Sequence, residues 1–200
     1  MSDLAEAIWE HVPPEAVPER FGERRDWLLA HVPPGAKVLD VGCGAGEFAT
    51  ALREAGAVPV GVDVAREPLR RAATRDPALD LRLWPAGEPL PVEDAWADIA
   101  WAGEVIEHVV DVAPWLSEVR RVLRPGGELL LSTPHHGPGR LLALALSPRR
   151  FAEHFEPRSD HVRFFSPATL RELLEDLGFE VLELRPALRR STILAVARRP

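Results

Sequence analysis

The feature that most constrains this chain is the stretch VLDVGCGAGEFA, residues 38–49, where an apolar run ends in Asp40 and is followed by alternating glycines, Gly42, Gly44 and Gly46. A glycine-rich turn between a buried strand and a helix lets the backbone approach a ligand closely. The N–H groups that open the helix then face that ligand. In an open α/β sheet, such a ligand lies outside the carboxyl ends of the strands. The stretch therefore predicts a strand–loop–helix unit that binds a nucleoside-containing molecule.

The rest of the chain also alternates between predicted strands and predicted helices. Short β-rich runs alternate with helical patterns, and the runs lie at 36–42, 58–64, 79–85, 97–103 and 127–133. Alternating strands and helices predict parallel βαβ units in a doubly wound sheet. Near the end of the chain, a helix over 167–179 is expected to begin at the N-cap Ser166. Two further runs, 180–186 and 191–198, have only a short connection, which favours an antiparallel hairpin at the sheet edge.

Length and charge limit the organisation and the partners. Two hundred residues predict a single domain. Residues 1–33 are expected to form a helical cap before the first strand, and residues 134–165 to form an insertion, or lid, over the carboxyl ends of the strands. The net charge of −7 argues against general binding of nucleic acid.

Cysteine usage and apolar patterning predict a cytoplasmic protein. The single cysteine, Cys43, has no partner for an internal disulfide, so a reducing compartment is expected. The first twenty residues lack the apolar centre of a signal peptide, and no apolar stretch approaches the length that spans a bilayer.

The residues around the glycine loop indicate the kind of ligand. The dinucleotide fingerprint G-x-G-x-x-G needs a small residue at its sixth position, where this chain has Glu47, so a nicotinamide-dependent oxidoreductase is disfavoured. Asp40, before the loop, suits a cationic ligand better than an anionic one. Asp63 lies about twenty residues after the first glycine. An acidic residue at this sequence separation forms hydrogen bonds with the ribose hydroxyls of a bound nucleotide.

Four segments together carry a resemblance to a known family: VLDVGCGAGEFA, VGVDVA, GEPLPVEDAWADIAWAGEVIEHV and RVLRPGGELLLSTP. In order and spacing, residues 36–135 resemble class I S-adenosylmethionine-dependent methyltransferases, in particular the group that includes ubiquinone-pathway O-methyltransferases and methyltransferase types 11 and 23. The later HVRFFSPATLRELLEDLGFEVLEL is similar to the tail of one subgroup. The resemblance implies a Rossmann-like α/β fold with seven strands in the order 3-2-1-4-5-7-6 and strand 7 antiparallel. N-terminal helices and a helical insertion after strand 5 would complete it.

The resemblance also implies a binding site for S-adenosylmethionine. The loop would line the methionine end of the cofactor, Asp40 would lie beneath it, and Asp63 would hold the ribose. Many relatives have an aspartate that reaches the adenine amine where this chain has Ala86, so Glu88 or backbone would substitute. The complete expected set is Asp40, Gly42, Cys43, Gly44, Gly46, Asp63, Val64, Gly87, Glu88, Ala102 and Gly103.

The acceptor side of the site rests on the segment GEVIEHV. On a helical turn, Glu104, Glu107 and His108 would share one face, where they supply a base or hold a divalent cation such as Mg²⁺. The E-x-x-E-H pattern resembles that of ubiquinone-pathway O-methyltransferases and of RNA 2′-O-methyltransferases, where it binds a metal, yet metal-free relatives carry nearly the same residues. A metal would need a further ligand, and His161 is the first candidate.

These observations predict methyl transfer to a small-molecule acceptor, with a hydroxyl oxygen as the expected nucleophile. Glu107, His108 and His135 are the expected catalytic residues. Two alternatives stay open, a metal-dependent RNA 3′-terminal 2′-O-methyltransferase and a non-catalytic module that keeps the cofactor fold. The sequence favours no nucleic-acid partner and leaves monomer and homodimer undecided.

Overall fold

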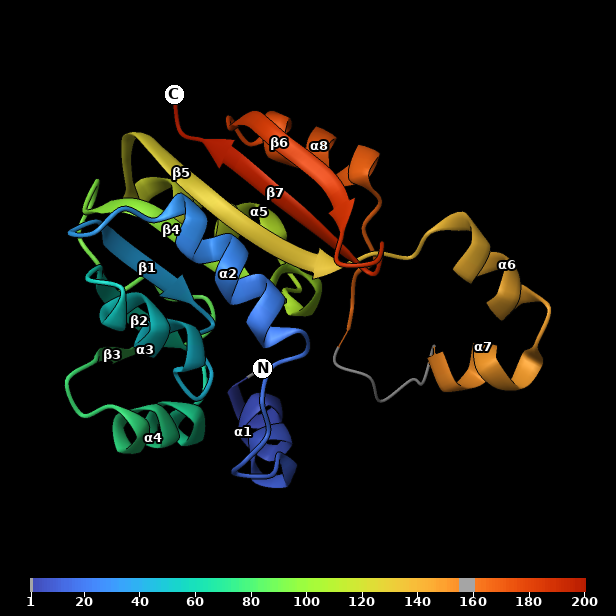
Figure 1. Cartoon of the computed structure of the whole chain (residues 1–200), viewed down its shortest axis with the longest axis horizontal. Coiled ribbons are helices and arrows are strands. Elements are labelled where there is room, and N and C mark those ends of the chain that lie inside the picture. Colours follow the sequence, from blue (N-terminus) through green and yellow to red (C-terminus); the bar gives the residue numbers. More distant parts are fainter. Residues whose placement is uncertain (1, 155–160) are drawn as a thin grey trace.

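The structure of the protein, a computed structural model, describes residues 2–154 and 161–200. Its centre is a seven-stranded sheet in the order β3-β2-β1-β4-β5-β7-β6 (Figure 1). β7 is antiparallel to both of its neighbours, and the other pairs are parallel. This arrangement confirms the fold predicted above. The strands are β1 (Lys37–Val41), β2 (Val58–Asp63), β3 (Asp80–Leu83), β4 (Ala97–Gly103), β5 (Leu123–Pro134), β6 (Glu180–Ala187) and β7 (Thr192–Arg198).

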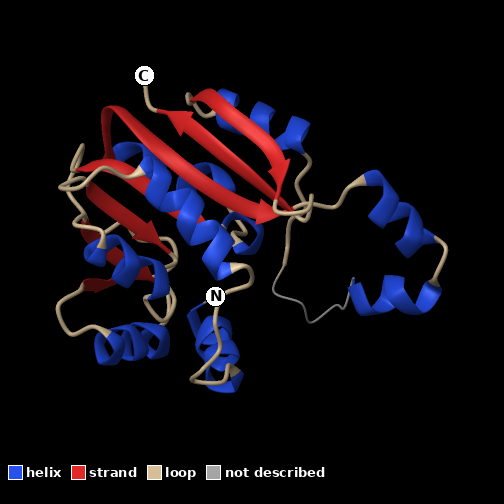
Figure 2. Ribbon diagram, in the orientation of Figure 1, coloured by secondary structure: helices blue, strands red, loops and turns tan. Residues whose placement is uncertain are grey.

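Helices cover both faces of the sheet (Figure 2). Successive side chains of a strand point to opposite faces, so Val38 of β1 packs in one core cluster and Leu39 in the other. α2 (Phe21–His31) and α3 (Glu47–Glu54) contribute Leu28 and Leu52 to the first cluster. α5 (Val112–Val122) and α8 (Pro167–Asp176) contribute to the second. α4 (Arg66–Arg75) packs beside β2 and β3.

The C-terminal helix and hairpin match the sequence expectations closely. Ser166 caps α8: its hydroxyl accepts a hydrogen bond from the Thr169 N–H, and the Thr169 hydroxyl accepts one from the Ser166 N–H. β6 then turns directly into β7, which inserts between β6 and β5. The short connection therefore produces the antiparallel edge that the sequence predicted.

Two helical segments lie outside the layered sheet. α1 (Ser2–His11) packs beside α4, whereas α6 (Pro138–Ala145) and α7 (Pro148–His154) form a hairpin that projects from the end of β5 (Figure 1). Residues 155–160, which belong to the expected insertion, lie outside the described residues. Among the helices that the structure describes, none has the length and apolar character needed to cross a membrane.

Candidate active site

The glycine loop joins β1 to α3 in a conformation that favours glycine. Gly42, Gly44 and Gly46 all have positive φ, at 68°, 54° and 82°. At Gly42 space is limiting as well, because a Cβ there would lie 2.7 Å from Cγ2 of Val105. The spacing of the glycines thus reflects both backbone conformation and a close approach between the ends of β1 and β4.

Asp63, at the end of β2, holds the loop in place. Its Oδ2 accepts a hydrogen bond from the Gly44 N–H at 3.0 Å, and its Oδ1 accepts one from the Ala65 N–H at 3.0 Å. Burial raises the pKa of this carboxyl, and the two N–H groups oppose that rise. A carboxylate fixed in this way is oriented before any ligand arrives.

Asp40 is a buried carboxyl beneath the loop. Its Oδ2 has no hydrogen-bond partner within the described residues. Burial raises the pKa of Asp40 to about 8, and the negative charges of Asp63 and Glu47 add to the rise. The unsatisfied oxygen and the surrounding carboxylates fit a ligand that is positively charged, as a sulfonium is, and oppose a phosphate.

Glu47, the residue that argued against a dinucleotide, has a structural partner. Arg75 of α4 donates from Nη2 to Glu47 Oε1 at 2.6 Å and from Nε to the Ala45 carbonyl at 2.9 Å. The first turn of α3 is therefore fixed to α4.

A cavity of about 400 Å³ lies between the N-terminal segment and the carboxyl ends of the central strands. It brings together seven of the residues that the sequence predicted for the site: Gly42, Cys43, Gly44, Gly103, Glu104, Glu107 and His161. The remaining described lining comes mainly from the N-terminal segment and α3, namely Trp9, Val12, Ala16, Val17, Pro18, Glu19, Arg24, Glu47, Phe48 and Pro134.

The other predicted site residues do not line this cavity. They are Asp40, Gly46, Asp63, Val64, Gly87, Glu88, Ala102, His108 and His135. The Glu88 carbonyl accepts a hydrogen bond from the Trp84 indole N–H at 2.7 Å. His135 Nδ1 lies 2.9 Å from the Arg190 carbonyl, so this ring is engaged with the β6–β7 turn. The cavity thus covers the expected methionine end of the cofactor site.

The segment after β4 does not form the helical turn that was expected to carry Glu104, Glu107 and His108 on one face. The 3₁₀ helix η1 covers only Ile106–His108, and Glu104 precedes it with a φ of 59°. Glu104 therefore does not share a helical face with Glu107 and His108, because the chain turns sharply as it leaves the sheet. Glu104 still reaches the cavity, through this left-handed conformation.

Glu107 is as deeply buried as Asp40, with 1% of its surface exposed. Its Oε2 accepts a hydrogen bond from the Thr133 hydroxyl at 2.9 Å, whereas its Oε1 has no partner in the described part of the chain. Burial raises the pKa of Glu107 to about 8, with a further contribution from Glu104. Its main-chain carbonyl accepts the N–H groups of Val162 and Arg163, which brings the returning chain to η1.

This docking places two histidines beside Glu107. The rings of His108 and His161 meet edge to face with centroids 4.7 Å apart. One ligand atom from each of Glu107, His108 and His161 lies within 4.8 Å of the others. The three side chains have the chemistry to share a proton or to hold a divalent cation.

Arg24 of α2 is a site residue that the sequence reasoning missed. It is 2% exposed, and its Nη1 lies 3.2 Å from the Ser132 hydroxyl and 3.6 Å from Glu104 Oε1. Burial lowers its pKa, against the opposing effect of Glu104 and Glu107. The only signal in the sequence was an arginine pair, Arg24–Arg25, and nothing local distinguishes the buried member.

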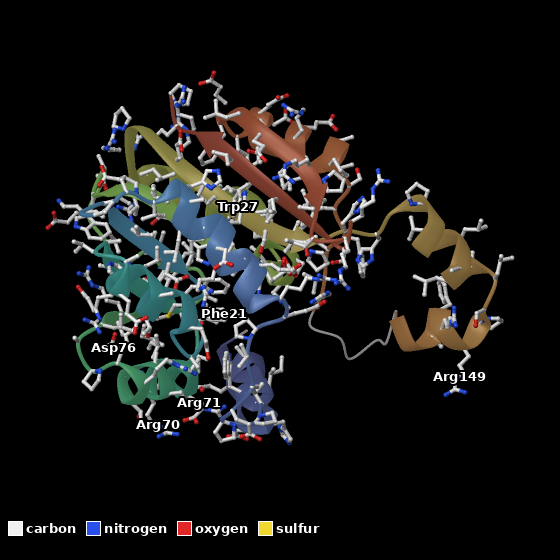
Figure 3. All side chains as sticks on the ribbon, in the orientation of Figure 1. Phe21, Trp27, Arg70, Arg71, Asp76 and Arg149 are labelled. Carbon is white, nitrogen blue, oxygen red and sulfur yellow. The ribbon has the colours of Figure 1, made fainter. Side chains whose placement is uncertain are left out.

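α1 closes the other side of the site. The Glu6 carboxylate accepts the N–H groups of Arg66 and Glu67 at 2.7 and 3.1 Å, which caps the start of α4. Arg71 lies on the side of α4 that faces α1 (Figure 3) and donates to the carbonyls of Val12 and Trp9 at 2.8 and 2.9 Å. The Trp9 ring passes 3.2 Å from the position of a Cβ on Gly44.

Solved structures identify the class of protein that this fold defines. Over 100% of its length, the chain superposes with a TM-score of 0.79 on 99% of a chain from the complex of the Haloferax volcanii Trm112 methyltransferase activator with a methyltransferase, at 22% identity. It superposes with a TM-score of 0.68 on an S-adenosylmethionine-dependent methyltransferase from Mesorhizobium loti, at 24% identity over 90% of this chain and 100% of that one. The fold is therefore that of the class I methyltransferases.

The amino-acid sequence then identifies the family. A family model described as a methyltransferase domain matches residues 9–184, and the chain belongs to this family of S-adenosylmethionine-dependent methyltransferases. A probable S-adenosylmethionine-dependent methyltransferase of Mycolicibacterium smegmatis is 38% identical over 76% of this chain and 55% of its own length. The ubiquinone biosynthesis O-methyltransferase of Ralstonia nicotianae is 30% identical over 81% of this chain and 71% of its own length. The human mitochondrial ubiquinone biosynthesis O-methyltransferase is 34% identical over 78% of this chain and 47% of its own length.

Proposed function

We propose that the protein transfers a methyl group from S-adenosylmethionine to a hydroxyl oxygen of a small-molecule acceptor. The observation that supports this most strongly is the buried Glu107 carboxyl: Glu107 lines the same cavity as Gly42 and Gly44, and its Oε1 has no hydrogen-bond partner in the described chain. The likeness to O-methyltransferases at about 30% identity favours oxygen over nitrogen or carbon. The small volume and the overall charge of −7 favour a small acceptor over a nucleic acid.

The residues for the cofactor follow from the geometry of the loop. Gly42, Cys43 and Gly44 would face the methionine end, Asp63 the ribose, and the Asp40 carboxyl would lie beneath the positive charge. Arg24 is a buried cation that lines the cavity, and it would pair with the α-carboxylate of the cofactor. When bound, S-adenosylmethionine supplies a methyl group on a sulfonium sulfur, which leaves as a neutral thioether.

Glu107 would act as the general base. In its deprotonated form it accepts the proton of the acceptor hydroxyl while the oxygen forms its bond to the methyl carbon and the carbon–sulfur bond breaks toward sulfur. Thr133 holds one carboxylate oxygen at 2.9 Å and leaves the other for the acceptor. His108 and His161 lie close enough to carry the proton onward. A positioned base of this kind contributes about 10²–10⁴-fold to a rate.

A divalent cation at the same three side chains is the second candidate. Glu107, His108 and His161 supply a carboxylate oxygen and two imidazole nitrogens within 4.8 Å of one another, a donor set that suits Zn²⁺ at least as well as Mg²⁺. The cation would then lower the pKa of the acceptor hydroxyl in place of a general base.

The test is methyl transfer from tritiated S-adenosylmethionine to a panel of phenols, catechols and hydroxy acids, run with Mg²⁺, with Zn²⁺ and with EDTA. We expect product that Glu107→Gln lowers by about 10²-fold or more. The matched control is Glu118→Gln, which removes a partly exposed carboxylate of α5 that does not line the cavity.

Each contrary result has a separate meaning. Transfer only to nitrogen nucleophiles, or unchanged turnover in Glu107→Gln, contradicts the proposed chemistry. Activity that EDTA abolishes and Mg²⁺ or Zn²⁺ restores replaces the general base by a metal. Transfer to the 3′ end of a small RNA contradicts the small-molecule acceptor.

A further inference from the structure

The segment HVRFF, residues 161–165, carries His161 to the cavity after the α6–α7 insertion. Residues 161–164 belong to no helix or strand. No ladder of regular hydrogen bonds therefore fixes this part of the chain, and its position depends on individual contacts. Whatever holds the segment also holds the His161 ring beside Glu107.

Two main-chain hydrogen bonds join the segment to η1. The N–H groups of Val162 and Arg163 both donate to the Glu107 carbonyl, at 2.9 and 3.1 Å. Because one carbonyl oxygen accepts both bonds, they attach the segment at a single point. A second point of attachment is needed to fix the direction in which the segment runs.

The side chain of Arg163 supplies this second attachment. Its Nε donates to the Val109 carbonyl at 2.9 Å, and its Nη2 donates to the Val110 carbonyl. Both carbonyls lie where the chain leaves η1, and an arginine side chain can bond the carbonyls at a helix end, which lack helical partners. The guanidinium presents its donors in a rigid planar fork, so a single side chain bonds two successive carbonyls.

The attachment determines where His161 lies. Further along the chain, the segment is anchored separately, by a bridge between Phe165 and His135. His161 lies on the other side of Arg163 from this anchor, and its ring meets the His108 ring edge to face with centroids 4.7 Å apart. The contact between the two histidines therefore depends on the bonds that Arg163 makes.

We propose that Arg163 is a positioning residue, whose guanidinium fastens residues 161–163 to η1 and so holds His161 against Glu107 and His108. The proposal rests on the proposed function, in which Glu107 takes the proton of the acceptor hydroxyl and the two histidines carry it onward. Arg163 is exposed and is not among the described residues that line the cavity. It therefore acts through His161 and does not touch the reacting atoms.

The first experiment measures this geometry and needs no acceptor. NMR of protein labelled in its histidine rings should show a nuclear Overhauser effect between His108 and His161 in the wild type, because the two rings are in contact. We expect Arg163→Met to abolish this effect. Arg120→Met is the matched control, because the Arg120 Nε likewise donates to a main-chain carbonyl, that of Gly178, at 3.2 Å.

The second experiment measures the rate with the acceptor that the wild type methylates best in the panel above. Arg163→Met should lower kcat by about tenfold or more, since a small misplacement of a group that takes part in the reaction is costly. The Kd for S-adenosylhomocysteine should stay unchanged, because Arg163 lies outside the cavity lining. Arg163→Lys should recover only part of the loss, since an ammonium lacks the planar fork. A loss of folded protein would instead reduce the number of S-adenosylhomocysteine sites in proportion to the rate.

Three outcomes would overturn the proposal. They are a ring-to-ring effect that persists in Arg163→Met, a kcat of Arg163→Met equal to that of Arg120→Met, and full recovery of kcat by Arg163→Lys, which would assign the effect to charge alone. A wild type that methylates no acceptor of the panel contradicts the proposed function. The ring measurement then still decides whether Arg163 holds His161 in place.

Discussion

At the scale of single residues, the site is defined by buried charges that are only partly compensated. Glu107 Oε1, Glu104 Oε1, Arg24 Nε and Asp40 Oδ2 are buried polar atoms that lack a hydrogen-bond partner in the described chain. A buried polar atom without a partner costs about 1–3 kcal/mol. Their concentration around one cavity therefore indicates that a bound ligand supplies the missing hydrogen bonds. In the absence of ligand, these unpaired atoms lower the stability of the folded protein.

The pKa of Glu107 gives a prediction about pH. The carboxyl must lose its proton before it can act as a base, and its pKa lies at about 8. The rate of methyl transfer should therefore rise with pH and level off above about pH 8, and the rising limb should disappear in Glu107→Gln. A pH–rate profile of turnover under saturating cofactor measures this. A profile that is flat between pH 6 and 9 in the wild type would show that another group takes the proton.

Arg24 gives a prediction about stability. Arg24→Met removes the buried cation beside Glu104 and Glu107, which should lower the free energy of unfolding by about 3–5 kcal/mol. Arg25→Met is the control, because the Arg25 side chain is only partly buried and its pair with Asp26 is worth at most about 1 kcal/mol. Urea unfolding of the three proteins checks this. Equal losses for the two variants would mean that burial of Arg24 carries no particular energetic weight.

At the scale of elements, the helix α1 closes one side of the site. Hydrogen bonds between α1 and α4, here called the latch, hold it there. α1 is bonded to α4 at two points, through the Glu6 carboxylate near its middle and through Arg71 to the Trp9 carbonyl near its C-terminal end. Trp9 lies between this latch and Gly44. Because α1 packs mainly against α4 and contributes no residue to either core cluster, we expect it to open without disturbing the sheet.

Removing the latch gives the third prediction. Glu6→Ala should cost about 0.5–2 kcal/mol at the start of α4 and should speed hydrogen exchange of the amides of residues 5–12. S-adenosylhomocysteine should slow this exchange in the wild type. Glu10→Ala, on the same helix, is the control, since Glu6 is the acid that bonds the two N–H groups. Unchanged exchange in Glu6→Ala would contradict the latch.

The segment after β4 shows how far local pattern reaches. The spacing of Glu104, Glu107 and His108 predicted one helical face, but only three residues are helical and Glu104 adopts positive φ. Glu104 contacts Arg24 through its carboxylate, and its N–H donates to the Ser132 carbonyl near the end of β5; both partners lie far away in the sequence. Periodicity describes a helix well and cannot describe a turn that tertiary contacts impose.

At the scale of the whole molecule, the parallel βαβ units, the antiparallel hairpin and the position of the glycine loop could be predicted from local signals, whereas the strand order was implied by the family resemblance. Strand–loop–helix units impose parallel strands, and the glycines of residues 42–46 mark the end where ligands bind. Arg24 and the projection of α6 and α7 could not be predicted in the same way. Both depend on which segments meet in space, and neither leaves a motif in the sequence.

The central claim is that the cavity beside the glycine loop holds S-adenosylmethionine, and isothermal titration with S-adenosylhomocysteine tests it most directly. We predict saturable binding of one equivalent by the wild type. Asp63→Ala should weaken it by about tenfold or more, because the carboxylate orients the loop and would bond the ribose. Asp80→Ala, at an exposed acid on β3, should leave binding unchanged. No binding by the wild type, or equal binding by Asp63→Ala, would contradict this account of the site.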